Sequence, residues 1–494
     1  WLSRPTRLRL GKLLAYLVRW LASGTGNPDG GWKHTVGETP GFAVFYAANR
    51  KQRQRFVQAD LLIHADWVIP VESPGALEHH SVAIEDGRIS AIAPRAEAQS
   101  QIDAREVVSL AGHALIPGLI NAHTHSPMSL FRGLADDMPL MSWLNDHIWP
   151  AEARWVHEEF VADGSRLAIA EMIRGGTTCF NDMYFFPDVT GRVAAQAGMR
   201  AVVGLILIDF PSAWSEDADG YFDRAITVHD QFRNHPLVRT AFAPHAPYSV
   251  SDAPLRRVAV LANELDLPVH MHVHETAAEI RGSLEQSGRR PIERLRRLDL
   301  INPTLMAVHM TQLEADEIDL FANSGAQVVH CPESNLKLAS GHCPVSQLIE
   351  VGINVALGTD GAASNNDLDM LGEMRSAALQ AKGVNADACA LPADQALRMA
   401  SLNGARALGI DQETGSLQVG KSADIVAVDL AQPETQPVFN PVSQIVYAAG
   451  REQVRHVWIS GRQLLKDRAL TTIDLGETLQ RTATWRERIA GRST

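Results

Sequence analysis

The stretch Leu115–Met128, LIPGLINAHTHSPM, carries an apolar run into two histidines that stand one residue apart. In an extended strand the side chains of residues i and i+2 lie on the same face, so His123 and His125 point into one space, about 7 Å apart along the backbone. Two imidazoles in that arrangement can bind one metal ion. A lone histidine pair is also typical of polar strand ends, so a metal site requires further ligands elsewhere in the chain.

The chain that follows this stretch alternates helix and strand patterns. From about Leu119 to Asp411, segments such as VAVLANELDLPVHMHVHE and IERLRRLDLINPTLMAVHM repeat a helical pattern followed by a buried strand. This repeat predicts an α/β fold with a parallel sheet, and its length fits a (β/α)₈ barrel of the TIM type. An open, doubly wound sheet is the alternative, but no glycine-rich nucleotide fingerprint follows any strand.

The two flanks of the predicted barrel are rich in β-forming residues. HHSVAIEDGRISAIAP places an Asp-Gly turn at Asp86-Gly87 between two strand-like runs, and GSLQVGKSADIVAVDL has the same character near the other end. We therefore divide the chain into five parts: a basic extension over 1–56, a first β-rich flank over 57–116, the barrel over 117–412, a second β-rich flank over 413–470 and a helical tail over 471–494.

Composition excludes several classes of protein. With 494 residues, 45% of them hydrophobic and 21% charged, the chain can bury a large core. Its formal net charge of −12 argues against nucleic acid as a partner. No run of 18 apolar residues predicts a membrane helix. The four cysteines are scattered without a CxxC pair, which indicates a reducing compartment, so we expect a cytoplasmic protein.

Residues 1–56 differ from the rest, because they hold ten Lys or Arg against two acidic residues, a charge of +8 that leaves −20 for the remainder. Leu8–Leu21 has an amphipathic pattern, but Arg19 interrupts its apolar run. We expect this segment to lie outside the fold and to act neither as a targeting signal nor as a membrane anchor.

Four further strand-like runs end in groups that can bind a metal ion or move a proton. They are LPVHMHVHET with His270, His272, His274 and Glu275, TAFAPHAPYS with His245, LMAVHMTQ with His309, and NVALGTDGAASNN with Asp360. In a barrel, functional groups gather at the carboxyl ends of the strands. Together with HTH, these runs supply nitrogen and oxygen ligands of the kind zinc prefers, and a spare carboxylate. Alternation alone does not choose among the three histidines of HMHVH.

These motifs resemble those of the amidohydrolase superfamily, and within it the deaminases of 5′-methylthioadenosine and S-adenosylhomocysteine, beside guanine deaminases and chlorotriazine hydrolases. The resemblance covers about residues 57–470 and rests on PGLINAHTH, on H-x-x-E-T at His272 to Thr276, on HCPESNLKLASG and on GTDGAASNN. It implies that the two β-rich flanks combine into a small β-sandwich beside the barrel.

The resemblance also implies a metal site. Its ligands would be His123, His125, His272 and Asp360, with His270 a layer deeper and His274 packed in an outer layer. Two-metal sites of this family are commonly bridged by a carboxylated lysine, yet no lysine stands between Lys51 and Lys337. We therefore expect one ion per subunit, Zn²⁺, with Fe²⁺ as the alternative.

The same resemblance implies deamination of a purine nucleoside by a homo-oligomeric enzyme. The metal would lower the pKa of a water molecule toward about 7 for attack on the carbon that carries the amino group. Glu275 would protonate the ring nitrogen, while His309 and Asp360 would pass the proton of the water to departing ammonia. Trp143, Glu152, His245 and Ser364 would contact the substrate, Glu152 through both ribose hydroxyls and His245 through the purine.

The segment before His245 suggests which substituent the ribose carries. Family members that bind S-adenosylhomocysteine hold its carboxylate with arginines there, whereas this chain has LILIDFPSAWSEDADGYFDRAITV, with apolar Phe210 and Trp214, several acidic residues and only Arg224. We therefore expect 5′-methylthioadenosine as the preferred substrate, with weaker turnover of S-adenosylhomocysteine and adenosine. The alternatives are another aminated ring, such as guanine, an oxidised purine or a triazine, and a catalytically inactive metal-binding scaffold.

Overall fold

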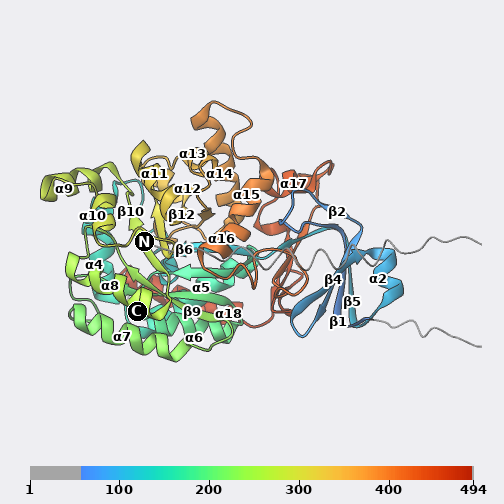
Figure 1. Ribbon diagram of the computed structural model, residues 1–494. Coiled ribbons are helices and arrows are strands. Elements are labelled where there is room, and N and C mark those ends of the chain that lie inside the picture. The colour runs from blue at the N-terminus through green and yellow to red at the C-terminus, as the bar shows by residue number, and fades with distance from the viewer. Residues whose placement is uncertain (1–56, 492–494) are drawn as a thin grey trace, which may run out of the picture. The chain divides into compact units, whose positions relative to one another are not determined.

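The computed structural model describes residues 57–491, so the predicted basic extension over 1–56 lies outside the described residues. The described chain forms an eight-stranded parallel sheet wrapped by helices and a nine-stranded mixed sheet (Figure 1). This arrangement confirms the predicted barrel with a small β domain built from both flanks, rather than an open doubly wound sheet. None of the helices within 57–491 combines the length and the apolar character needed to cross a bilayer.

The barrel strands follow one another around the sheet in chain order. They are β6 (Leu119–Thr124), β7 (Thr177–Asp182), β8 (Arg200–Leu207), β9 (Val238–Pro244), β10 (Val269–Val273), β11 (Leu305–His309), β12 (Gln327–His330) and β13 (Val355–Leu357). Every residue of β6, β7, β8, β10 and β11 is buried. Such continuous burial is expected for parallel strands that face helices on one side and the barrel interior on the other.

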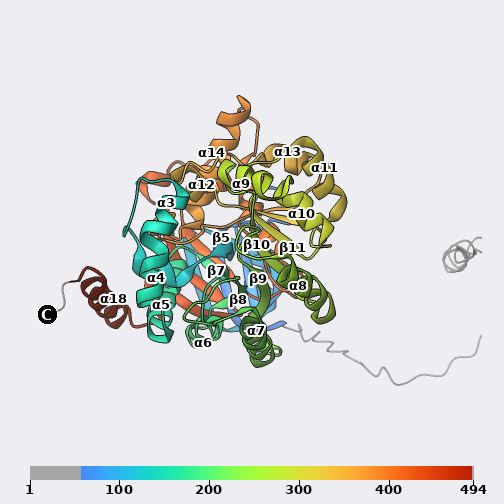
Figure 2. The same cartoon turned by 90° about the vertical axis from the view of Figure 1, so that its left-hand side faces the viewer.

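Helices occupy the intervals between the strands and surround them (Figure 2). They are α5 (Glu158–Arg174), α6 (Pro187–Ala197), α7 (Ala218–Phe232), α8 (Asp252–Leu265), α9 (Ala277–Ser287), α10 (Pro291–Arg297), α11 (Ala315–Ser324), α12 (Pro332–Lys337), α13 (Val345–Glu350), α14 (Met370–Asn385), α15 (Ala393–Met399) and α16 (Leu402–Ala407). Local sequence sets their ends: α11 begins with a capping box between Glu314 and Glu317 and ends at Gly325, which has a φ of 76°.

The barrel closes where the chain after β13 meets β6. The Asp360 N–H donates to the carbonyl of His123 at 3.0 Å, and the Thr359 N–H donates to the Asn121 side chain at 3.0 Å. A Cβ atom added at Gly358 would lie 2.7 Å from the His123 nitrogen, so only glycine permits this approach. The closure brings the HTH motif beside the GTD motif.

The second sheet joins the two flanks of the chain. Its strands are β1 (Val57–Val68), β2 (Leu77–Glu78), β3 (His80–Glu85), β4 (Arg88–Pro94), β5 (Ile102–Pro117), β14 (Ile425–Asp429), β15 (Val454–Ile459), β16 (Arg462–Lys466) and β17 (Ala469–Leu470). Strand β5 pairs in parallel with β1 and in antiparallel with β14, so the sheet needs both ends of the described chain. Ile63, Leu115, Ile425 and Trp458 share one of its core clusters.

The stretch LIPGLINAHTHSPM leads the chain from this sheet into the barrel. Strand β5 ends at Pro117 and β6 begins at Leu119, so Gly118 is the junction. A Cβ atom at Gly118 would lie 1.9 Å from the Thr178 hydroxyl oxygen, and the Gly118 N–H donates to the carbonyl of Asp424. The apolar residues of this run thus contribute to three core clusters, and its histidines stand at the far end of β6.

The remaining described helices are α2 (Arg95–Gln101), α3 (Leu140–Trp143), α4 (Trp149–Trp155), α17 (Pro441–Tyr447) and α18 (Leu475–Ile489), and a π-helical turn (Leu144–Ile148) joins α3 to α4. Helix α18 is the predicted helical tail. It packs against α5, where the buried Trp485 indole donates to Asp163 at 3.0 Å and meets the Phe160 ring edge-on.

A buried ion pair holds the barrel to the second sheet. The Arg200 guanidinium of β8 donates to the Asp424 carboxylate at 3.0 Å, and Asp424 also accepts from the Thr414 hydroxyl and the Ser460 N–H. Burial alone would raise the pKa of Asp424, but the charge of Arg200 and these hydrogen bonds hold it below its usual value. The pair therefore adds stability above the ordinary aspartate pKa, and this contribution is lost as the pH falls through the lowered pKa.

Replacing Asp424 with alanine should lower the free energy of unfolding by about 3 to 5 kcal/mol, because it leaves the buried charge of Arg200 without its partner. Urea unfolding of the two proteins measures the difference. The matched control is Glu293→Gln, which removes an exposed i,i+4 pair with Arg297 and should change the stability by less than about 1 kcal/mol. Equal effects of the two substitutions would contradict the structural role of the buried pair.

Candidate metal centre and catalytic cavity

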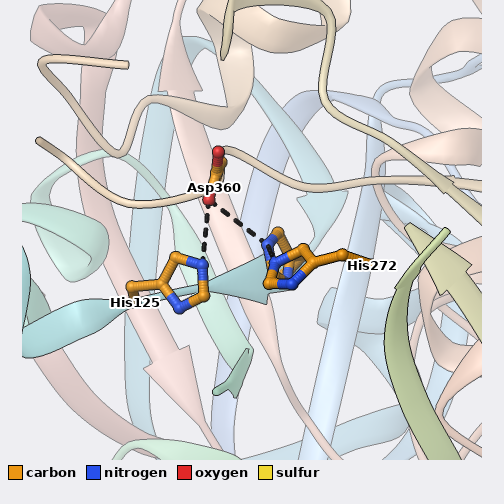
Figure 3. Close-up of side chains that lie close together, drawn as sticks. His125, His272 and Asp360 are labelled. Carbon is orange, nitrogen blue, oxygen red and sulfur yellow. Dashed lines mark hydrogen bonds and ion pairs between the residues drawn. The ribbon is translucent and has the colours of Figure 1, made fainter. Parts of the chain in front are cut away.

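Four of the predicted site residues converge at the carboxyl ends of the barrel strands. His123 and His125 lie at the end of β6, His272 on β10 and Asp360 just after β13, and their ligand atoms all lie within 4.8 Å of one another. Figure 3 shows the His125 and His272 rings with the Asp360 carboxylate. The closure of the barrel thus brings together residues that are up to 237 positions apart in the sequence.

Three of the separations between ligand atoms are close to the edges of a tetrahedral metal site, and all four ligand atoms lie within 4.8 Å of one another. The His123 and His272 Nε2 atoms are 3.1 Å apart, and Asp360 Oδ1 lies 3.1 Å from His125 Nε2 and 3.3 Å from His123 Nε2. A tetrahedron with metal–ligand bonds of about 2.0 to 2.1 Å has edges of about 3.3 to 3.4 Å. Three imidazoles and one carboxylate are a donor set that suits zinc and iron.

Hydrogen bonds behind the ligands orient two of the imidazole rings. His125 Nδ1 lies 2.5 Å from the carbonyl of Met183, and His272 Nδ1 lies 2.9 Å from the carbonyl of His245. Because a carbonyl oxygen only accepts, each Nδ1 carries a proton, so Nε2 is the nitrogen that each ring offers to a metal ion.

The Asp360 carboxylate is held in place by several donors. Its Oδ2 accepts from the hydroxyls of Ser334 and Ser364 at 2.7 and 2.8 Å, and its Oδ1 accepts from the Gly361 N–H at 2.8 Å. Burial would raise the pKa of Asp360, but its contacts with the imidazoles of His123 and His125 hold it well below the ordinary value. Asp360 is therefore an anionic ligand at neutral pH.

The structure distinguishes the three histidines of HMHVH. His272 joins the cluster, whereas His270 lies deeper, with its Nε2 2.9 Å from His123 Nδ1. His274 has a left-handed φ of 53° and turns away from the cluster, where its Nε2 accepts from the Ile292 N–H at 3.3 Å. The expected outer-layer contact of His274 with the ligands is thus replaced by a contact with α10.

Glu275 lies beside the cluster without being part of it. Its Oε2 is 3.9 Å from His309 Nε2. Burial and the negative charge of Asp360 raise the pKa of Glu275 to about 8, so the carboxyl group is protonated at neutral pH. The Glu279 carboxylate accepts from the Glu275 N–H at 2.7 Å and thereby holds the turn that carries Glu275.

His309 presents its Nε2 atom to the same space. Its Nδ1 is 2.9 Å from the Asn335 side-chain oxygen, and burial lowers the pKa of His309, so the ring is neutral with a lone pair on Nε2. Sequence reasoning missed both Asn335 and Glu279. Asn335 lies within the quoted motif HCPESNLKLASG, and Glu279 stands one helical turn after Glu275, but their partners could be recognised only in the folded chain.

An apolar cavity opens above the cluster. Its lining includes all four residues that were expected to contact the substrate: Trp143, Glu152, His245 and Ser364. The remaining lining residues are His125, Met128, Leu140, Leu144, Ile148, Trp149, Met183, Tyr184, Phe185, Ile206, Ile208, Phe210, Tyr248, His272, Glu275, His309, Leu338 and Asp360.

The four expected contact residues differ in what they offer a ligand. Trp143 presents only its ring, because its N–H donates to the carbonyl of Ala135. The hydroxyl of Ser364 is bonded to Asp360, so this residue contributes mainly to the position of the carboxylate. Burial lowers the pKa of His245 to about 3, which keeps the ring neutral.

Glu152 supplies a second carboxyl group to the wall of the cavity, in addition to that of Glu275. Burial raises its pKa to about 7, and the nearby Tyr184 hydroxyl and His125 ring oppose that shift. Glu152 therefore carries a substantial fraction of negative charge at neutral pH and can accept hydrogen bonds from hydroxyl groups.

Comparisons with known proteins agree with this geometry. The sequence profile of the Amidohydrolase family matches residues 114–464. A 5-methylthioadenosine/S-adenosylhomocysteine deaminase from Teredinibacter turnerae is 49% identical over 434 residues, covering 88% of this chain and 98% of the relative, and its counterpart from Saccharophagus degradans is 48% identical, covering 87% and 97%.

Solved structures show the same fold. The crystal structure of an adenosine deaminase from Xanthomonas campestris with bound zinc superposes with a TM-score of 0.87 at 54% identity, covering 88% of this chain and all of the other. Atrazine chlorohydrolase from Arthrobacter aurescens, complexed with zinc, has a TM-score of 0.81 at 23% identity, covering 86% of this chain and all of the other. At that identity the second similarity concerns the fold alone.

Replacing His272 with alanine should abolish stoichiometric binding of a divalent ion, because it removes one of the four converging ligands, whereas His274→Ala should leave binding intact. Metal content after dialysis against zinc and gel filtration, measured by atomic emission, separates the two variants. If His272→Ala keeps the ion and His274→Ala loses it, then His274 rather than His272 is the metal ligand.

Proposed function

This chain belongs to the amidohydrolase family, and from that membership and the geometry of its site we propose that it is a zinc-dependent deaminase of 5′-methylthioadenosine. The reaction replaces the amino group of the purine with oxygen from water, giving the inosine analogue and ammonia. S-adenosylhomocysteine and adenosine are weaker substrates in this proposal, and one Zn²⁺ binds per chain.

The observation that carries the proposal is the pair of carboxyl groups with opposite protonation. Asp360 is ionised within the ligand cluster, while burial and the charge of Asp360 raise the pKa of Glu275 to about 8. A carboxyl group that is kept protonated near neutral pH beside a metal site is suited to general acid catalysis. Deamination of an aromatic ring requires such an acid, because addition to the ring is favourable only when the adjacent ring nitrogen takes up a proton.

The converging side chains of His123, His125, His272 and Asp360 would hold the zinc ion, which when bound lowers the pKa of a water molecule toward about 7 and so supplies a nucleophile at neutral pH. One ion per chain is supported by the absence of lysine between Lys51 and Lys337, since no lysine in this interval can bridge two ions.

Glu275 and His309 divide the proton transfers in the proposed reaction. Glu275, protonated at the start, donates to the ring nitrogen next to the carbon that is attacked. His309, neutral and with its Nε2 lone pair exposed to the cavity, takes one proton from the water and passes it to the amino group, which leaves as ammonia. The second proton of the water returns to Glu275 as the new carbonyl forms, so both groups regain their starting protonation. General acid and base groups of this kind each contribute about 10²- to 10⁴-fold in rate.

The walls of the cavity fit the rest of a nucleoside. Glu152 accepts hydrogen bonds from the two ribose hydroxyls, the ring of Trp143 packs against the sugar and base, and His245 faces the purine. The carboxylate of Glu152 is the only acidic group among the lining residues that lies outside the cluster and its neighbour Glu275, so it alone is free for this role within the described chain.

The apolar side of the cavity supports a methylthio group at the 5′ position. Ile206, Ile208 and Phe210 line it, and the described lining contains no lysine or arginine that could pair with an amino-acid carboxylate. The Arg224 guanidinium, the one arginine of the preceding segment, lies 4.8 Å from the centre of the Trp214 ring instead. Burying a methylthio group is worth roughly 1 to 2 kcal/mol at about 25 cal/mol per Å².

Two of the acidic residues of that segment have partners within the protein. Asp217 caps the amino end of α7 by accepting from the Gly220 N–H, and Asp219 accepts from Arg257. Discrimination against S-adenosylhomocysteine follows from the apolar wall and from the missing cation.

Zinc-loaded protein should deaminate 5′-methylthioadenosine with a higher kcat/KM than S-adenosylhomocysteine or adenosine, and Glu275→Gln should reduce kcat by at least about 10²-fold because it lacks the acidic proton. The change in ultraviolet absorbance that accompanies conversion of the adenine ring into a hypoxanthine ring follows the reaction. The zinc content of the variant should stay unchanged, since Glu275 is not a ligand. Turnover of guanine or a triazine without turnover of the nucleosides would refute the proposed substrate, and zinc binding without any turnover would favour an inactive scaffold.

Replacing Glu152 with glutamine should lower kcat/KM for 5′-methylthioadenosine by about 10- to 100-fold at pH 8, because a hydrogen bond to a charged group is worth about 1.5 to 3 kcal/mol. The effect should appear mainly in KM, measured by steady-state kinetics.

The 2′-deoxy analogue supplies a control, since it lacks one of the two hydroxyls and should lose less on the same substitution. In the wild-type protein KM should rise as the pH falls through about 7, where Glu152 takes up a proton, and this rise should be absent from Glu152→Gln. An equal loss for both substrates at every pH would contradict a contact with the ribose.

A further inference from the structure

A histidine that does not face the cavity lies directly behind the proposed metal ligands. His270 is completely buried and its Nε2 lies 2.9 Å from the Nδ1 atom of His123. The two rings are nearly perpendicular, with an interplanar angle of 77° and centroids 4.8 Å apart. His270 is absent from the lining of the cavity above the cluster, so it can act on the site only through His123.

The positions of the protons follow from the neighbours of His123. Its Nε2 faces Asp360 Oδ1 and His272 Nε2, and is therefore the atom that would bind the ion and must carry no proton. A neutral imidazole has one proton, which then resides on Nδ1 and is donated to His270 Nε2. His270 in turn holds its own proton on Nδ1, which has no hydrogen-bond partner among the described residues.

His270 accepts the hydrogen bond from His123 through an unprotonated Nε2, so its ring is neutral. In this it differs from the carboxylates that often accept from metal-binding histidines. The cluster already contains the negative charge of Asp360, so a neutral acceptor fixes the His123 ring without further neutralising a bound cation.

We propose that His270 is a positioning residue for the metal ion: by accepting the Nδ1 proton of His123, it selects the tautomer and ring orientation in which His123 binds the ion. The inference rests on the proposed ligand set but not on the proposed substrate. Partners of this kind typically change metal affinity by about 10- to 100-fold when they are lost.

The experiment measures the affinity of the metal-free protein for Zn²⁺ alone, by competition with a chromophoric chelator. His270→Leu and His270→Met remove the acceptor at similar volume and should bind Zn²⁺ about 10- to 100-fold more weakly than the wild type. His270→Gln keeps a side-chain oxygen that can accept from His123 and should recover most of the affinity. His274→Gln changes a histidine of the same motif that points away from the site and should bind as the wild type does.

The thermal unfolding midpoint of each metal-free variant shows that it is folded, and the visible spectrum of bound Co²⁺ reports the ligand geometry directly. The apolar variants should shift this spectrum and His270→Gln should not. Unchanged Zn²⁺ affinity in the apolar variants would overturn the proposal, and so would equal weakening in all three His270 variants, because packing rather than the accepted hydrogen bond would then be responsible. Failure of the wild-type protein to bind Zn²⁺ would instead reject the ligand set itself.

Discussion

The carboxylate of Asp360 lies inside the barrel with almost no contact with water, and it is stable there only because several donors surround it. Ser334, Ser364 and Gly361 donate to it, and the imidazoles of His123 and His125 face one of its oxygens. An isolated buried charge would be far too costly, so these contacts are what make the buried carboxylate tolerable. The closure of β13 onto β6 through backbone hydrogen bonds places the donors and the imidazoles around it.

Two carboxyl groups in the same small volume take opposite protonation states because their partners differ. Asp360 is surrounded by donors, which hold its pKa well below the usual value, whereas Glu275 has burial and a neighbouring negative charge, which raise its pKa to about 8. The site thus separates a permanent anion, suited to binding a cation, from a neutral acid, suited to giving up a proton. Because the charge of Asp360 contributes to the raised pKa of Glu275, the two roles depend on each other.

A second layer of side chains sets the direction of the first. The carbonyls of Met183 and His245, the side chain of Asn335 and the ring of His270 each take the outer proton of one imidazole, so that the inner nitrogens of the site are left with lone pairs. The partners are neutral in every case, and Asp360 remains the single anion that faces the ligand cluster directly. In the proposed enzyme, the charge and the ligand orientation at the metal site therefore depend on these outer groups as well as on the ligands.

Much of this protein could be predicted from its sequence. The alternation of helix and strand patterns determined the barrel, because each segment must bury an apolar face at its own period, and the H-x-H spacing together with the polar strand ends singled out the residues that converge. Short-range rules could not choose among His270, His272 and His274, which share one parity. They also gave no sign that the hydroxyl of Ser364, which lines the cavity, donates to Asp360, or that Asp217 caps the amino end of α7. Only the tertiary structure decided these points, because the direction of a side chain after the end of a strand depends on backbone turns, such as the left-handed one at His274, and on partners that lie far away in the sequence.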